Sequence, residues 1–311
     1  MNKNSKIYLA GHLGLVGSAI ARKLASDGYT HIVTKTHSEL DLTRQAETEE
    51  FFRLERPEYV ILSAAKVGGI VANSTYPADF LYDNLAIAQN VIHASHQFGV
   101  KKLVNLGSSC IYPKFAPQPM KEEALLTGPL EVTNEAYAIA KIAAIRLCKH
   151  FNDQYGTNFI SAMPTNLYGP GDNYDLNSGH VLPAMIRKFH EAKVGKTSVL
   201  LWGDGSPFRE FLYSDDLADA VVYLLANKDY ADVGEFINVG SAQEVTIRQL
   251  AETVAGIVGF TGEVKWDASK PNGAPRKLMD SGRLFALGWK PKVELEDGIR
   301  RAYQDFLARP A

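Results

Sequence analysis

Short apolar runs rich in β-branched residues alternate with amphipathic stretches of helical period through the first half of the chain. Such alternation is typical of parallel strands joined by crossover helices. The pattern therefore predicts an α/β fold with a doubly wound parallel sheet of the Rossmann type, covered by helices on both faces. The expected strands are 6–10, 31–35, 59–65, 102–109 and 158–164, and the expected helices are 16–27, 44–55, 77–98 and 135–155.

The sequence changes character after Tyr168. The stretch YGPGDNYDLNSGH is rich in Gly, Asn and Asp, which are typical of loops. Beyond it the pattern predicts a smaller C-terminal α/β domain, with helices at 181–192 and 215–226 and strands at 198–205 and 235–240. The expected division is a Rossmann domain over 1–172, with a return to it at 211–240, and a second, substrate-binding domain over 173–210 and 241–311.

Composition excludes two classes of partner. The 311 residues include 33 Lys and Arg against 35 Asp and Glu, for a formal net charge of -2. This balance creates no field that attracts nucleic acid or an acidic membrane surface. No apolar run approaches a membrane span and no secretory signal pattern is present, which favours a cytoplasmic protein. The two cysteines form neither a disulfide framework nor a metal-binding pattern, so no metal is expected.

A glycine-rich turn follows the first predicted strand. Gly11, Gly14 and Gly17 in AGHLGLVGSAI lie between that strand and a helix that begins near Leu15. Glycines at this place permit a tight turn and let a pyrophosphate approach the free N–H groups of the helix N-terminus. Because strand, turn and helix follow in order, dinucleotide binding is favoured over an ordinary connection.

The end of the second predicted strand indicates which dinucleotide binds. An acidic residue there would hold the ribose of NAD, but this chain has Lys35, Thr36 and His37, with Arg44 beyond. Lys35 and His37 are placed to face an adenosine 2′-phosphate, so NADP(H) is the expected cofactor. The alternative is that both are ordinary solvated loop residues.

Tyr137 and Lys141 in YAIAK are four residues apart, so a helix places them on one face. An ammonium beside a phenol favours the phenolate, and the expected consequence is a lowered pKa that lets Tyr137 exchange a proton with a substrate carbonyl. Ser108, at the end of the fourth predicted strand, can hydrogen-bond the same oxygen. The nearby thiol of Cys110 can act as a base where a cation favours its thiolate. His180, whose imidazole titrates near neutrality, is the candidate partner acid.

Five motifs carry a family resemblance: GSSCIYPK, NEAYAIAKIA, MPTNLYGP, SGHVLPA and DASKPNGAPRKL. With the GxxGxxG turn they resemble the GDP-L-fucose synthase family of extended short-chain dehydrogenases/reductases, over the whole chain. The resemblance implies 3,5-epimerisation of GDP-4-keto-6-deoxy-D-mannose followed by NADPH-dependent 4-keto reduction to GDP-L-fucose. It makes Ser108, Tyr137 and Lys141 a catalytic triad, and Cys110 and His180 the base and acid of epimerisation.

Binding residues follow from the same resemblance and from local chemistry. A GDP-sugar needs cations for its phosphates and an aromatic or apolar slot. Candidate substrate residues are Lys188, Trp202, Arg209, Lys270 and Asp280, with Arg276 and Lys277 as further cations. Candidate cofactor residues are Gly11, His12, Leu13, Gly14, Leu15, Val16, Gly17, Lys35, His37, Asp41, Leu42, Ala64, Ala65, Leu106, Gly107, Ser108, Tyr137, Lys141, Pro164, Thr165, Asn166, Leu167 and His180. His12 and His37 stand where the family suggests Arg, which makes the expected 2′-phosphate site less basic.

Two other functions are compatible with parts of the sequence. A 4-epimerase or dehydratase of the same fold is disfavoured because Cys110 stands where dehydratases carry acidic residues. A non-catalytic NADP-sensing regulator is disfavoured because Tyr137 and Lys141 are both present.

Two further expectations concern the helices. Cys148 lies about 16 Å along the helix from Tyr137 and is expected to be a small core residue. The helix 77–98 is apolar on more than one face, which predicts a two-fold homodimer.

Overall fold

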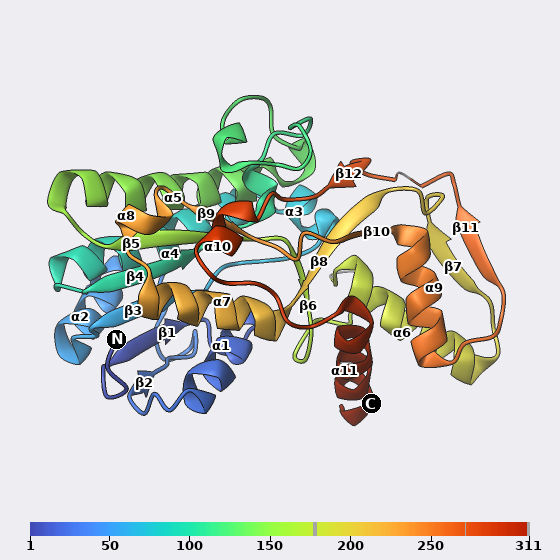
Figure 1. The fold of residues 1–311 in the computed structure, drawn as a ribbon, viewed down its shortest axis with the longest axis horizontal. Coiled ribbons are helices and arrows are strands. Elements are labelled where there is room, and N and C mark those ends of the chain that lie inside the picture. Colours follow the sequence, from blue (N-terminus) through green and yellow to red (C-terminus); the bar gives the residue numbers. More distant parts are fainter. Residues whose placement is uncertain (177–178, 271, 310–311) are drawn as a thin grey trace.

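A computed structural model of the chain describes residues 1–176, 179–270 and 272–309. Its centre is a six-stranded parallel sheet in the order β2-β1-β3-β4-β5-β9 (Figure 1). The strands are β1 Ile7–Ala10, β2 Ile32–Val33, β3 Tyr59–Leu62, β4 Lys102–Leu106, β5 Phe159–Pro164 and β9 Ile237–Val239. This arrangement confirms the predicted Rossmann-type α/β fold class.

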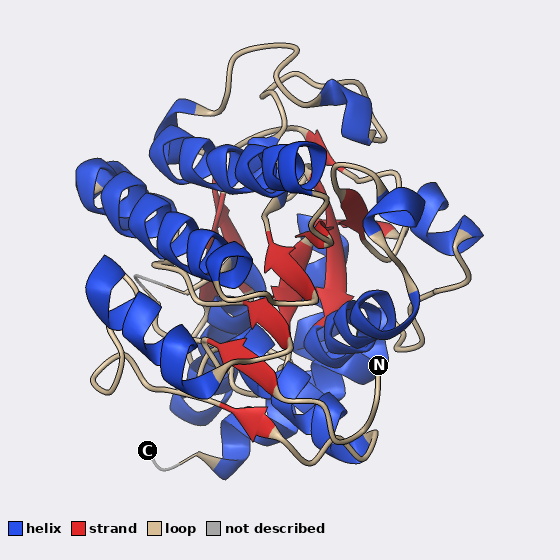
Figure 2. Ribbon diagram, turned by 90° about the vertical axis from the view of Figure 1, so that its left-hand side faces the viewer, coloured by secondary structure: helices blue, strands red, loops and turns tan. Residues whose placement is uncertain are grey.

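Helices cover both faces of the sheet, as Figure 2 shows around the central strands. One face is covered by α1 Leu15–Ser26 and α7 Ser214–Asn227, and the other by α2 Gln45–Glu55, α4 Pro77–Gln97 and α5 Glu135–Tyr155. Because side chains alternate along a strand, β1 sends Ile7 and Leu9 into the first core and Tyr8 and Ala10 into the second. Both faces are buried, so the strands are continuous apolar runs in the sequence.

A smaller α/β part lies beside this sheet, on the right in Figure 1. One core is shared by its three helices and includes Phe189, Leu201, Val254 and Ile299. The helices are α6 Val181–Gly195, α9 Ile247–Val258 and α11 Leu295–Ala308, and the strands are β6 Asn166–Tyr168, β7 Val199–Trp202, β8 Phe208–Tyr213, β10 Glu244–Thr246, β11 Val264–Asp267 and β12 Arg276–Lys277. The short helices are α3 Ile70–Thr75, α8 Tyr230–Val233 and α10 Gly282–Ala286, with 3-10 turns at Ser109–Ile111, Glu122–Ala124 and Val132–Asn134.

The expected helices 16–27, 44–55, 77–98, 135–155 and 215–226 agree with the structure to within one residue at each end, and 181–192 is three residues short. The strand predictions 59–65 and 102–109 are too long, because the chain leaves the sheet after Leu62 and Leu106. Strands β6, β10, β11 and β12 have two to four residues each, too few for a period of two to indicate them.

The proposed domain boundaries remain a prediction. Residues 211–213 lie in β8, which pairs with β6, β10 and β12, outside the six-stranded sheet. Strand β9 then rejoins that sheet beside β5.

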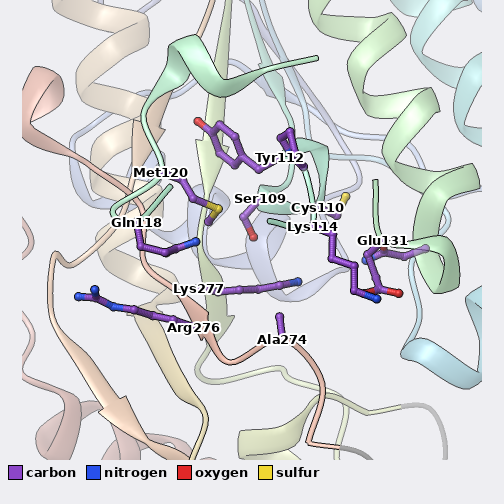
Figure 3. A pocket seen from close by; sticks show the side chains of 12 residues that line it. Ser109, Cys110, Tyr112, Lys114, Gln118, Met120, Glu131, Ala274, Arg276 and Lys277 are labelled. Atoms are coloured by element: carbon purple, nitrogen blue, oxygen red, sulfur yellow. The ribbon is translucent and has the colours of Figure 1, made fainter. Parts of the chain in front are cut away.

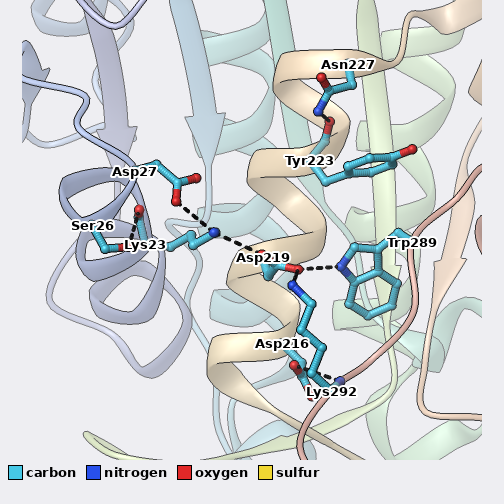
Figure 4. A network of polar contacts seen from close by, with 9 residues as sticks. All are labelled: Lys23, Ser26, Asp27, Asp216, Asp219, Tyr223, Asn227, Trp289 and Lys292. Carbon is cyan, nitrogen blue, oxygen red and sulfur yellow. Dashed lines mark hydrogen bonds and ion pairs between the residues drawn. The ribbon is translucent and has the colours of Figure 1, made fainter.

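Asp219 on α7 connects three segments of the chain (Figure 4). Its carboxylate lies 3.0 Å from Lys23 Nζ on α1 and accepts hydrogen bonds from Trp289 Nε1 at 2.9 Å and Lys292 Nζ at 2.8 Å. One turn earlier, Asp216 accepts the backbone N–H groups of Lys292 and Val293. These contacts fix the segment before α11 against the helix pair α1 and α7, and so hold the smaller part in place.

The described residues contain neither a membrane-spanning helix nor a cluster of metal-binding side chains. None of the helices that the structure describes combines the length and the apolarity needed to cross a membrane. Nor do three or more His, Cys, Asp or Glu side chains within residues 1–176, 179–270 and 272–309 come together as a metal site.

Candidate active site

The strand order reverses at β1, and the glycine-rich turn follows that strand. Strands β2 and β3 pair with β1 on opposite sides. In open α/β sheets, ligands bind at the carboxyl ends of the strands where the order reverses. Most predicted cofactor residues lie at this edge. They follow β1 (11–17) and β3 (64–65), or lie at and after the last residue of β4 (106–108) and of β5 (164–167).

The three glycines of the turn differ in what requires them. Gly11 has φ +84°, and a Cβ there would lie 2.6 Å from the backbone nitrogen of Ala64. At Gly17 a Cβ would lie 2.0 Å from the carbonyl oxygen of Gly11, so both glycines are required for the turn to pack. At Gly14 the nearest atom would be 3.6 Å away. The protein itself therefore leaves room in front of the α1 N-terminus, where a pyrophosphate would approach.

Basic side chains gather beyond β2. Lys35 Nζ lies 4.0 Å from Glu39, and His37 Nδ1 lies 3.8 Å from Asp41. Both ion-pair distances are long, and His37 is exposed. Nδ1 of His12 is buried and has no hydrogen-bond partner within the described residues. These groups fit an adenosine 2′-phosphate. Leu42, by contrast, is a core residue whose carbonyl accepts from Asn90.

Four predicted catalytic residues lie close together at the end of β4. Ser108 caps the 3-10 turn Ser109–Ile111, and its Oγ accepts the N–H of Cys110 at 3.5 Å. Lys141 Nζ donates to the carbonyl oxygen of Leu106 at 2.8 Å and lies 5.6 Å from the centre of the Tyr137 ring. The helix spacing of Tyr137 and Lys141 therefore directs both side chains toward the end of β4, as predicted from one helix face.

The expected lowering of the pKa of the Tyr137 phenol is wrong. Burial raises the pKa of Tyr137, and the neighbouring thiol of Cys110 raises it further. Burial also lowers the pKa of Lys141 to about 8. Desolvation disfavours the charged form of each group and so determines the direction of both shifts. Tyr137 therefore carries its proton near neutral pH and is set to donate it.

Cys110 lines a small cavity between the end of β4 and the smaller part (Figure 3). Burial raises the pKa of Cys110, while a hydrogen bond from Ser108 and the charges of Lys277 and Lys141 oppose this effect. The sequence suggests a thiol that a neighbouring cation activates, and the structure supplies the cations without a net lowering of the pKa. The cavity is lined by Ser109, Cys110, Tyr112, Pro113, Lys114, Gln118, Met120, Glu131, Asn134, Ala274, Arg276 and Lys277.

His180 precedes α6 as its N-terminal cap residue. Its residue surface is exposed, yet desolvation of the imidazole lowers its pKa. The imidazole makes no hydrogen bond to Ser108, Cys110 or Tyr137 among the residues described, so its role as an acid stays a prediction. Ser178 and Pro271, within two of the family motifs, lie outside the described residues. Cys148 is fully buried against the sheet, which confirms it as a core residue.

The predicted substrate residues lie on the smaller part. Trp202, 60% exposed, ends β7, and Lys270 Nζ lies 5.8 Å from its ring centre. Arg209 on β8 stands opposite Lys277 on β12. The remaining two have structural partners: Lys188 donates to the carbonyl of Leu200 at 3.2 Å, and Asp280 accepts the N–H of Gly282 at 2.9 Å.

Several residues that line the cavity were not predicted from the sequence. Asn134 Oδ1 is buried without a partner among the described residues, and Asn134 lines the cavity three residues before Tyr137. Its position in NEAYAIAK, just before a helix, is the signal that could have indicated it. Lys114 and Glu131 form a 3.0 Å ion pair there, between residues 17 positions apart whose meeting no local pattern indicates.

Known proteins are similar to this chain over nearly its whole length. Residues 7–240 match the model described as the NAD dependent epimerase/dehydratase family. The chain is 61% identical to GDP-L-fucose synthase 1 of Arabidopsis thaliana, over 98% of this chain and 94% of that protein. It is 52% identical to GDP-L-fucose synthase of Escherichia coli K12, over 97% and 96%. A structure of a GDP-D-glycero-L-gluco-heptose synthase from Campylobacter jejuni in the presence of NADPH is similar with a TM-score of 0.93, at 40% identity, over 99% of this chain and 100% of that one.

Proposed function

This chain belongs to the NAD dependent epimerase/dehydratase family, and we propose that it is an enzyme that converts GDP-4-keto-6-deoxy-D-mannose into GDP-L-fucose. The conversion comprises 3,5-epimerisation followed by reduction of the 4-keto group, with NADP(H) as cofactor. Identities of 61% and 52% to proteins named GDP-L-fucose synthase support the conversion. The similar structure in the presence of NADPH supports the cofactor.

The observation that carries the proposal is the grouping of Ser108, Cys110, Tyr137 and Lys141 at the end of β4, with the thiol facing a cavity. A ketone held there would meet two hydrogen-bond donors and one base. Carbons 3 and 5 of the sugar both flank the carbon 4 ketone, so the same carbonyl acidifies the proton on each. One site can therefore serve both epimerisations.

In the epimerisation, the thiolate form of Cys110 takes a proton from the carbon beside the ketone. The C–H bond breaks, an S–H bond forms, and the electron pair moves to the carbonyl oxygen as an enolate. Tyr137 and Ser108 hold that oxygen by hydrogen bonds, and preorganised donors of this kind stabilise developing negative charge. His180 returns a proton to the opposite face of the carbon.

In the reduction, the glycine-rich turn of Gly11, Gly14 and Gly17 would hold NADPH, which would supply the hydride for carbon 4. Tyr137 donates the proton to the oxygen, and its raised pKa keeps that proton in place until it is needed. Lys141 anchors the helix to β4 and places a cation near the phenol. Arg209, Lys188 and Lys270 are the proposed cations for the diphosphate; Trp202 is the proposed aromatic contact and Asp280 a polar one.

The second candidate is the same pair of reactions on another GDP-sugar. The 40% identity to a GDP-heptose synthase favours this candidate, because the similarity covers 99% of this chain and 100% of that one. A non-catalytic regulator that senses NADP is the least favoured reading, since Tyr137 and Lys141 are both present and meet at the end of β4.

The test is incubation of the protein with GDP-4-keto-6-deoxy-D-mannose and NADPH, followed by NMR of the sugar product. GDP-L-fucose is the expected product, with one NADPH consumed for each molecule formed. GDP-6-deoxy-D-talose or GDP-D-rhamnose would mean reduction without epimerisation and would contradict the proposal. No NADPH oxidation with this sugar, but oxidation with a 4-keto GDP-heptose, would support the second candidate.

A further inference from the structure

Lys277 and Cys110 face one cavity from two different sheets. Lys277 ends β12, which pairs with β8 in the smaller part, whereas Cys110 follows β4 of the central sheet. Both residues line the same cavity. Figure 3 shows the Lys277 side chain extending into it, with the amine directed toward the side where Cys110 and Lys114 lie. The basic side chain of Lys277 therefore enters, from the smaller part, the cavity that Cys110 lines.

The other charged groups of this cavity already have partners. Lys114 pairs with Glu131 at 3.0 Å, and Arg276 pairs with Glu244 through hydrogen bonds of 2.8 and 2.7 Å. Lys277, although next to Arg276 in sequence, has no ion pair or side-chain hydrogen bond within the described part of the chain. Among the described residues that line the cavity, Lys277 is therefore the cation without an ion pair.

The balance of charge around the thiol explains why such a cation is needed. Burial raises the pKa of Cys110, and a buried thiol carries little thiolate near neutral pH. Ser108, Tyr137 and Lys141 face it from β4 and α5, and Lys277 faces it from β12. Lys141 is already bound to the carbonyl oxygen of Leu106. Lys277 thus remains to compensate a negative sulfur.

The state of Lys277 itself suits this task. Burial lowers the pKa of Lys277, and the adjacent charge of Arg209 lowers it further, while Cys110 and Glu131 act in the opposite direction. A lowered pKa means that Lys277 gives up its proton more readily than an ordinary lysine, and its ammonium form gains stability when a negative charge appears beside it. Thiol and amine can therefore exchange one proton without an additional reactant.

We propose that Lys277 is a positioning residue that holds Cys110 in its thiolate form. The S–H bond of Cys110 breaks and an N–H bond forms on Lys277, which leaves a thiolate beside an ammonium. The use of that thiolate as the base for carbons 3 and 5 rests on the proposed function. The formation of the ion pair does not, because it requires only the protein.

The experiment measures alkylation of Cys110 by iodoacetamide as a function of pH, without any sugar substrate. A Cys148→Ala background leaves Cys110 as the single thiol, and intact-protein mass spectrometry follows the reaction. Only the thiolate reacts, so the rate reports the fraction of thiolate. The variants are Lys277→Met and Lys277→Arg, with Arg276→Met and Lys114→Met as matched controls that remove a neighbouring charge.

Lys277→Met should slow alkylation near neutral pH by roughly tenfold and move the titration to higher pH by roughly one unit, since one unit changes the thiolate fraction tenfold. Lys277→Arg should restore most of the rate, and both controls should react like the parent. Unchanged alkylation in Lys277→Met would overturn the proposal, and so would equal slowing in Arg276→Met. Lys277→Gln replaces Lys277→Met if the latter does not fold.

The two proposals fail independently. A Lys277-dependent titration in a protein that makes no GDP-L-fucose would support the ion pair and contradict the proposed function. Formation of GDP-L-fucose with an alkylation profile that does not depend on Lys277 would support the proposed function and contradict the ion pair.

Discussion

Lys141 donates a hydrogen bond from Nζ to the carbonyl oxygen of Leu106 at 2.8 Å, and so joins helix α5 to the end of strand β4. The side chain is only 8% exposed. The contact fixes where Tyr137, one turn earlier on α5, meets the residues that follow β4. It also places a titratable ammonium in a poorly solvated position, which has a measurable consequence for stability.

Through Lys141, the free energy of unfolding should rise with pH between about pH 8 and about pH 10.5. The folded pKa is about 8 and the ordinary value is 10.5. The unfolded chain therefore binds more protons in this window, and folding becomes more favourable as pH rises. A difference of about 2.5 units corresponds to about 3 kcal/mol.

The measurement is urea unfolding of the wild type and of Lys141→Met at about pH 8 and about pH 10. Subtracting the free energy of unfolding of the variant from that of the wild type cancels the contributions of the other titrating groups. The stability of the wild type relative to the variant should increase with pH. A stability difference that stays constant across this range would contradict the prediction.

Lys35 should contribute to the choice of NADPH over NADH. The two cofactors differ at the adenosine 2′-phosphate, and Lys35 lies beyond β2 with Glu39 as a distant partner at 4.0 Å. Loss of one charge-assisted contact costs about 1.5 kcal/mol or more, or roughly tenfold in affinity. Lys35→Met should therefore raise the Michaelis constant for NADPH by roughly tenfold and leave that for NADH unchanged.

Steady-state kinetics with both cofactors test this, with Lys290→Met as the control because Lys290 is an exposed lysine of the C-terminal segment. Equal Michaelis constants for NADPH and NADH in the wild type would mean that the side chains beyond β2 do not discriminate between the cofactors.

Local signals made the fold and most of the site predictable from the sequence. The Tyr137 and Lys141 spacing needs one helix, and the glycine-rich turn needs one strand and one helix, so residues close in sequence define both. The cavity depends instead on contacts between distant segments. Lys277 lines the same cavity as Cys110 because β12 pairs with β8, and a two-residue strand has no sequence pattern of its own. Burial determines the protonation of Tyr137, and the spacing of Tyr and Lys carries no information about burial.

A two-fold homodimer through α4 and α5 remains a prediction. Both helices cover one face of the sheet, and Tyr82 on α4 and Ile139 on α5 are 69% and 43% exposed. Exposed apolar residues on neighbouring helices are typical of an interface. Ile139→Lys should shift the mass in light scattering from dimer to monomer. Leu307→Lys on α11, also at an exposed apolar position, should leave the mass unchanged. A monomeric wild type at micromolar concentration would refute the dimer.

Epimerisation and reduction should separate in single variants of the active site. If Cys110 is the base and Tyr137 the acid of reduction, Cys110→Ser should lose deuterium uptake from heavy water at carbons 3 and 5, while NADPH still binds. Tyr137→Phe should block NADPH oxidation and retain part of the exchange, because Ser108 still holds the enolate oxygen. His180→Asn should retain deuterium exchange by the Cys110 thiol at one position yet fail to complete the inversion.

NMR of the sugar after incubation in heavy water, with and without NADPH, distinguishes these outcomes. Cys148→Ala is the matched control for the thiol, because Cys148 is buried in the core. This variant should exchange the sugar protons at the wild-type rate. The thiol of Cys110 lies beside the phenol of Tyr137 and raises its pKa, so Cys110→Ser should also alter the pH dependence of reduction to a small extent. Exchange at the wild-type rate in Cys110→Ser would mean that the thiol only packs against the cavity wall, and that another group removes the carbon protons.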